Sequence, residues 1–169
     1  MSFLAEAIAK LLDTPVKAAE LVTGLSEEQL SWKPTEFFSL RESVLHLRDI
    51  DVEGYEPRVR LMLEQEMPTL PDVDGGKLAR ERNYNAQPVD PALTELAIVR
   101  AASAEQLSGC TETDLQRTAE MQGVGVITLR QLLEMWMRHD AEHLADMAEL
   151  RRAIESDDPN VSFGEHEAA

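Results

Sequence analysis

The fold of this 169-residue chain is decided by the stretch Thr128–Ile154, TLRQLLEMWMRHDAEHLADMAELRRAI. Its pattern predicts one long helix with a single apolar face. On a helical wheel of about 100° per residue, Leu132 and Leu150 fall on the midline of that face. Trp136 and Met147 lie on its flanks. The pattern predicts a core helix that packs against other helices along one side.

His139 and His143 occupy the same midline, one helical turn apart, so that their rings can converge on one point. A buried imidazole needs partners for its two ring nitrogens. Apolar neighbours above and below supply none, whereas one metal ion satisfies both rings together. The pair therefore favours a metal site over two histidines that are buried simply as packing.

Earlier segments predict further helices. Residues 2–24 have helical apolar spacing, and Thr14-Pro15 predicts that this helix bends or restarts there. Ser26–Gln29 is a capping box that opens a short helical turn. Ser39–Glu42 is a second capping box, and the long helix that follows should reach about Glu64. Together these signals predict two long helices joined by a short helical turn.

Pro57 should kink the second long helix, since a proline inside a helix removes one backbone hydrogen bond. A third long helix should open at Asp90-Pro91 and end near Gly109. With the helix that Thr128–Gln131 caps, these make four long helices. They predict an all-α four-helix bundle.

The connections complete the expected organisation. Residues 67–90 form a long connection, which either covers a site or simply crosses between helices. Residues 110–127 form a second one, with a polar helical turn followed by GVGVI. Residues 1–155 are predicted to be a single domain, and the acidic tail 156–169 is predicted to be disordered.

Composition limits the classes of function. Hydrophobic residues make up 43% and aromatic residues 5%, which predicts a mostly aliphatic core. The net charge of -16 argues against nucleic acid and anionic membranes as partners. Cys110 is the only cysteine, so an intramolecular disulfide is impossible. No targeting or membrane-spanning pattern is evident, and we expect a cytoplasmic protein.

A zinc-like ion takes three protein ligands in a catalytic site and four in a structural one. His46 is the only histidine on another predicted helix, at the edge of an apolar arc, and this position alone leaves its role open. His166 belongs to the acidic tail, where a solvated side chain is the simpler interpretation. The segment His139–His143 also matches the inverted zinc-protease pattern H-x-x-E-H. That pattern needs a further carboxylate ligand well downstream, for which the remaining chain has little room, and Glu142 projects away from the histidine midline.

Taken together, these motifs resemble the DinB/YfiT-like metalloprotein bundles. The resemblance rests on segments in order along the chain: Thr14-Pro15, GLSEEQLSWKP at 24–34, SLRESVLHL at 39–47, TLRQLL at 128–133 and HDAEHL at 139–144. It implies a four-helix bundle of the up-up-down-down type with long crossover connections, often dimeric, so a homodimer is expected. It also implies one divalent metal ion, such as zinc or nickel, held by His46, His139 and His143.

Three neutral imidazoles would leave the charge of the ion uncompensated, and its open position would lower the pKa of a bound water or thiol. Relatives in this family include transferases that use a low-molecular-weight thiol on electrophilic small molecules. The resemblance thus implies metal-activated thiolate attack on a small-molecule substrate. Two alternatives stay open: a metal-dependent hydrolase, and a non-enzymatic bundle with a structural metal or a bound ligand.

Other side chains are weaker candidates. Cys110 follows a helix end far in sequence from the histidines, and a small filler residue is the simpler interpretation. Asp146 and Glu53 are placed to orient a ligand ring, although a solvated or structural acid is the simpler role for each. Trp136 either lines the pocket or belongs to the core.

Overall fold

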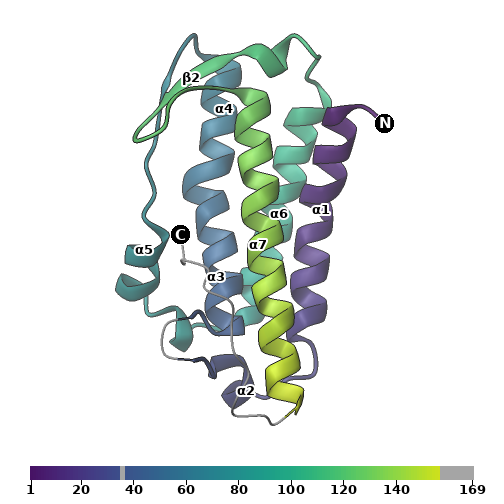
Figure 1. The fold of residues 1–169 in the computed structure, drawn as a ribbon, viewed down its shortest axis with the longest axis vertical. Helices are drawn as coiled ribbons and strands as arrows, with labels where there is room; N and C mark the ends of the chain where they lie inside the picture. Colours follow the sequence, from purple (N-terminus) through teal and green to yellow (C-terminus); the bar gives the residue numbers. More distant parts are fainter. Residues whose placement is uncertain (35–36, 157–169) are drawn as a thin grey trace.

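Four long helical segments lie side by side in the computed structural model, which describes residues 1–34 and 37–156 (Figure 1). The segments are α1 (Phe3–Val22), α3 (Leu40–Ile50) continued through the π turn η1 (Asp51–Tyr55) into α4 (Glu56–Glu64), α6 (Val89–Ser108) and α7 (Leu129–Ser156). The predicted all-α four-helix bundle is confirmed. The disorder predicted for the tail concerns residues that, from 157 on, lie outside the described ones. No helix in the described part is long and apolar enough to cross a membrane.

The four long helical segments run in the order down-up-up-down along the chain (Figure 1). Thr14 bonds to Asp140 and Leu21 to Arg151, so α1 and α7 run parallel, and α3–α4 and α6 run the opposite way (Figure 1). This down-up-up-down order differs from the expected up-up-down-down order. The connection from α1 through α2 (Glu27–Ser31) to α3 turns back at the same end of the bundle, so these two helices are antiparallel. The one long crossover therefore joins α4 to α6.

α1 is one continuous helix through Pro15, where the sequence predicted a bend or restart. A proline inside a helix leaves the carbonyl four residues earlier without its usual N–H donor. Here that carbonyl belongs to Leu11, and it accepts a hydrogen bond from Arg100 Nη1 of α6 at 3.1 Å. A donor from another helix thus compensates for the proline, and the helix continues.

Both capping boxes form as predicted. Ser39 accepts from the backbone N–H of Glu42, whose carboxylate accepts from the N–H of Ser39, and Ser26 and Gln29 make the equivalent pair. The sequence predicted that Pro57 would kink the helix from inside. Instead, Pro57 lies in the first turn of α4, and the helix is distorted directly before it by the π turn η1. A π turn is a local widening of the helix and is often found at functional sites.

The two long connections contain short elements, of which the sequence predicted only the polar helical turn within residues 110–127. The crossover holds β1 (Thr69–Leu70), α5 (Gly75–Glu81) and the 3-10 turn η2 (Tyr84–Ala86). The connection before α7 holds the 3-10 turn η3 (Asp114–Gln116), β2 (Thr118–Met121) and β3 (Gly125–Thr128). β1 pairs in parallel with β2, which pairs in antiparallel with β3. Strands of two to four residues carry too little alternation to be predicted.

The core is divided along the bundle axis by buried polar side chains. One apolar cluster includes Leu11, Val59 and Trp136, and the other includes Val44, Leu96 and Met147. Between them lies a group that we call the polar layer, namely Thr14, His46, Asp51, Arg100, His139, Asp140 and His143. All four long segments contribute to it. The candidate site is part of this layer.

Candidate metal centre

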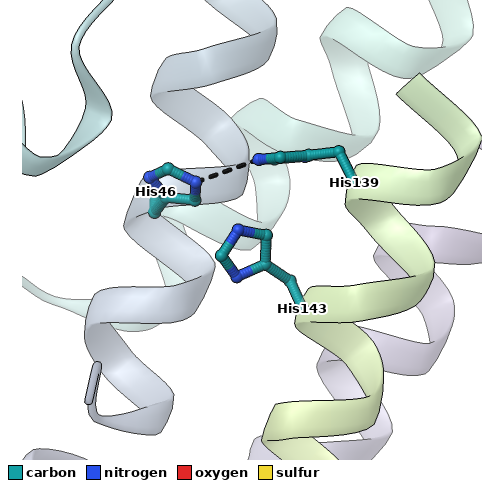
Figure 2. A group of neighbouring side chains, drawn as sticks. All are labelled: His46, His139 and His143. Atoms are coloured by element: carbon teal, nitrogen blue, oxygen red, sulfur yellow. Dashed lines mark hydrogen bonds between the residues drawn. The ribbon is translucent and has the colours of Figure 1, made fainter. Parts of the chain in front are cut away.

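Three histidines from two helices point toward one another (Figure 2). His46 comes from α3, and His139 and His143 come from successive turns of α7. His46 is fully buried and His143 is 8% exposed, while the side chain of His139 keeps 16% of its surface accessible. The structure thus brings together the three side chains that the sequence proposed as ligands.

The geometry fits a metal ion. One ring nitrogen from each histidine can be chosen so that all three lie within 4.8 Å of one another. The Nε2 atoms of His46 and His139 are 3.1 Å apart. Two nitrogens bound to one tetrahedral zinc ion, each at about 2.05 Å, would be about 3.3 Å apart. The observed spacing is close to this value.

The protonation state of His46 is also the one that a metal ligand requires. Burial, followed by the nearby rings of His143 and His139, holds the pKa of His46 well below its ordinary value. The ring is therefore neutral, which is the form that binds a metal. The Nδ1 atoms of His46 and His139 are buried and make no hydrogen bond within the described residues.

Aromatic rings surround the histidines. The ring centroid of Phe38 is 5.1 Å from that of His46 and 6.4 Å from that of His143. The centroid of Tyr55 is 5.8 Å from that of His139, and its ring stacks on Trp136 at 4.8 Å. Burial raises the pKa of Tyr55 to about 12, so its phenol stays protonated. These rings give the histidines a largely apolar surrounding, in which electrostatic interactions are stronger than in water.

A buried ion-pair network adjoins the site. The guanidinium of Arg100, on α6, bonds to Asp51 of η1 and to Asp140 of α7. Trp136 Nε1 donates to Asp51 at 2.9 Å, and Thr14 Oγ1 donates to Asp140 at 2.8 Å. Asp140 directly follows His139, and its Oδ1 is 3.8 Å from His139 Nδ1, which is beyond hydrogen-bond distance. Two carboxylates and one guanidinium thus fix η1, α6 and α7 to one another.

The two carboxylates of this network titrate differently. Burial raises the pKa of Asp51 to about 6, because the opposing effect of Arg100 does not fully offset the loss of solvation. Burial acts on Asp140 too, but the charge and hydrogen bonds of Arg100 and the hydroxyl of Thr14 outweigh it and lower the pKa. With both ionised, the network has one net negative charge beside the histidines. That charge would partly compensate a bound cation.

The weaker sequence candidates fall mostly outside the site. Glu53 forms an ion pair with Arg82, and Glu142 is exposed. Trp136 is fully buried in the core beside the site. Asp146 is partly buried on α7, and its role in orienting a ligand stays a prediction.

Cys110 is unsuited to act as a nucleophile. It is partly buried at the end of α6, where its Sγ donates to the carbonyl of Gln106 at 3.5 Å. Burial and the charge of Asp114 raise the pKa of the thiol, so the reactive thiolate is disfavoured. The prediction that Cys110 is a filler residue agrees with these contacts.

The sequence patterns did not identify the ion-pair network around Arg100, nor the contact between Gly75 and His46. Arg100 and Asp51 were not singled out, although an arginine on the apolar face of a helix is a usable signal. Asp140 lies next to a histidine of the core stripe, yet only the fold shows its partners. Gly75, in the crossover, gave no signal in the sequence, and it contacts His46.

The chain is similar to several known proteins. Residues 10–147 match the DinB superfamily. The chain is 28% identical to the uncharacterized protein YuaE of Bacillus subtilis, over 78% of this chain and 89% of YuaE. It is 25% identical to “Putative metal-dependent hydrolase OB0782” of Oceanobacillus iheyensis, over 86% of this chain and 84% of that protein.

A solved structure shares the fold. YfiT from Bacillus subtilis, described as “a probable metal-dependent hydrolase with an unusual four-helix bundle topology”, superposes with a TM-score of 0.83 at 22% sequence identity. The superposition covers 90% of this chain and 87% of YfiT. At this identity the likeness shows the four-helix bundle fold alone.

Proposed function

Because this chain belongs to the DinB superfamily, we propose that it holds one divalent metal ion through His46, His139 and His143 and transfers a low-molecular-weight thiol to small electrophiles. Zinc and nickel are the ions that we expect, since both accept imidazole ligands. The observation that supports this proposal best is the donor set itself. It consists of three imidazoles, and the group of possible ligands in the described residues contains no carboxylate.

A neutral donor set makes an anionic fourth ligand favourable. When bound, a divalent ion supplies a positive charge that lowers the pKa of a thiol or water beside it. Asp51 and Asp140 compensate a divalent ion only in part, because Arg100 neutralises one of their two charges. The chain's own residues keep the rings neutral, hold them in place and exclude bulk water.

The proposed reaction is a substitution at carbon. The thiolate sulfur attacks an electrophilic carbon, a carbon–sulfur bond forms, and the leaving group departs with its electron pair. The proton of the thiol goes to solvent. No protein carboxylate is needed as a general base once the thiol is ionised. This matches a site whose neighbouring acid Asp140 is engaged by Arg100.

A metal-dependent hydrolase is the second candidate, and the names of OB0782 and YfiT favour it. In that case water is the nucleophile, and an ester or amide bond is cleaved. The same three histidines serve both reactions. The two candidates differ in the nucleophile, so the requirement for a thiol decides between them.

The first experiment measures metal content. Protein purified without added ions should contain about one divalent ion per chain, and the metal should be identified by mass spectrometry. His139→Ala and His143→Ala should each lose it. Glu142→Ala is the matched control, since Glu142 lies between the two histidines in sequence and is exposed. Full metal content in both histidine variants would refute the site.

The second experiment measures turnover. The metal-loaded protein is incubated with chlorodinitrobenzene and a panel of cellular thiols, and release of chloride is followed. Turnover that requires one thiol supports the transferase. Hydrolysis of ester substrates without any thiol supports the hydrolase, and no turnover in either assay leaves a metal-binding protein without enzymatic activity.

A further inference from the structure

The crossover between α4 and α6 touches the His46 ring through Gly75. A Cβ atom added at Gly75 would lie 2.5 Å from Cε1 and 2.8 Å from Nδ1 of His46. Its next neighbour would be Ile50, at 3.1 Å. Any side chain at this position would overlap the imidazole. The backbone of α5 is therefore seated directly on one edge of the His46 ring.

Another atom of the same ring faces α7. Nε2 of His46, which is bonded to Cε1, is 3.1 Å from Nε2 of His139 (Figure 2). The ring therefore contacts both the crossover and α7. Normal carbon contacts of about 3.5 Å would require a shift of about 1 Å if Gly75 had a Cβ atom. Metal sites tolerate displacements of only about 0.5 Å. The position of α5 thus sets how closely Nε2 can approach the other two ligands.

The crossover is held in this position by hydrogen bonds to α3 and α4. The hydroxyl of Tyr84 and Nη1 of Arg82 both donate to Asp49 Oδ2, at 2.6 and 2.7 Å. Asp49 lies on α3, one turn after His46, and is 3% exposed. On the other side of α5, Arg58 of α4 donates to the carbonyl of Pro71 at 2.9 and 3.1 Å. The crossover is therefore fastened to α3–α4 on both sides of Gly75.

We propose that Gly75 is a positioning residue for the metal ion. The crossover is held by its hydrogen bonds to Asp49, and its backbone at Gly75 contacts the His46 ring. This contact directs Nε2 of His46 toward His139 and His143. The inference rests on the proposed metal site. It goes beyond that site because it assigns a function to the crossover, a segment that contributes no ligand. Gly75 acts only through His46.

The test compares two alanine substitutions in the same short helix. Gly75→Ala adds a Cβ atom that overlaps His46. Gly76→Ala adds a Cβ atom at an ordinary contact distance, 3.5 Å from its nearest neighbours in Arg80 and Asp74. Both substitutions raise helix propensity equally. Zinc affinity is measured by competition with a chromophoric chelator. Visible spectra of the cobalt-loaded proteins report the coordination geometry, and circular dichroism of the metal-free proteins checks folding.

We expect Gly75→Ala to weaken zinc binding about 10- to 100-fold, as removal of other contacts to metal ligands does. Its cobalt spectrum should change, while Gly76→Ala keeps the affinity and spectrum of the wild type. If Gly75→Ala does not fold, Tyr84→Phe loosens the same segment and should weaken binding in the same direction. Loss of folding in both variants would mean that the crossover serves stability alone, and would overturn the proposal.

The outcomes separate this inference from the proposed function. Wild-type affinity in Gly75→Ala, with one ion bound, overturns the positioning role and leaves the metal site intact. A wild-type protein that binds no divalent ion overturns both. Weakened binding in Gly75→Ala, in a protein without thiol-dependent turnover, supports the positioning role and refutes the transferase.

Discussion

Arg100 and Asp140 form a two-pronged ion pair in the middle of the bundle, with Nη1 donating to Oδ2 at 2.5 Å and Nη2 to Oδ1 at 2.8 Å. Arg100 is fully buried and Asp140 is 4% exposed. A guanidinium and a carboxylate paired in this way have a fixed mutual orientation. Because Asp140 directly follows His139, the pair fixes the turn of α7 that carries this candidate ligand.

Replacing Arg100 with methionine should destabilise the protein by about 3–5 kcal/mol, because Asp51 and Asp140 would be left buried without a cation. Urea denaturation of the metal-free protein measures the change in the free energy of unfolding. Arg60→Ala is the control, since Arg60 is half-exposed and its ion pairs span 3.6 and 3.7 Å. It should cost less than about 1 kcal/mol. A similar, small effect from both variants would contradict this account of the network.

Stability should depend on pH through Asp51. Its folded pKa of about 6 lies above the ordinary value of 3.8, so between these values the folded state binds more protons than the unfolded state. The contribution of this group to the free energy of unfolding is therefore present at low pH and is lost as the pH rises through about 6. Asp51→Asn should make the free energy of unfolding decrease less as the pH rises through about 6. The check is urea denaturation of both metal-free proteins from pH 4 to 7, and equal slopes would show that Asp51 is not the group responsible.

Trp136→Phe should cost about 1.5–3 kcal/mol, because the substitution removes the indole N–H that donates to the buried carboxylate of Asp51. Stacking on Tyr55 is retained in part. Trp32→Phe is the matched control, since Trp32 is 44% exposed. Thermal or urea denaturation compares the two variants. Equal costs would mean that the hydrogen bond to Asp51 contributes little.

Cys110→Ser should leave any thiol-dependent turnover unchanged, because the nucleophile is expected to come from the small thiol. The thiol of Cys110 bonds to a backbone carbonyl, and burial raises its pKa. Rates are measured with the metal-loaded variant under the conditions used for the wild type. Loss of turnover in a folded, metal-loaded variant would place the nucleophile on the protein itself.

The sequence alone determined the features that depend on neighbours within a turn or two of helix. Ser39 and Glu42 predict a helix start because both partners of the capping box are three residues apart. His139 and His143 predict a shared site because helical spacing places them on one face. Limits such as the end of α4 at Glu64 and of α6 at Ser108 followed from the same local signals.

Only the tertiary structure decided the features that depend on contacts between distant segments. Pro15 is tolerated inside α1 because Arg100 reaches the carbonyl of Leu11 from another helix. The order of helix directions depends on which connection crosses the bundle, and nothing local to the crossover encodes its path. His46 is placed among the ligands by the packing of α3 on α7, and Gly75 lies against it only after the crossover has folded back. Helical periodicity reports which face of a helix is buried, but the partner of that face is fixed by the packing of the whole chain.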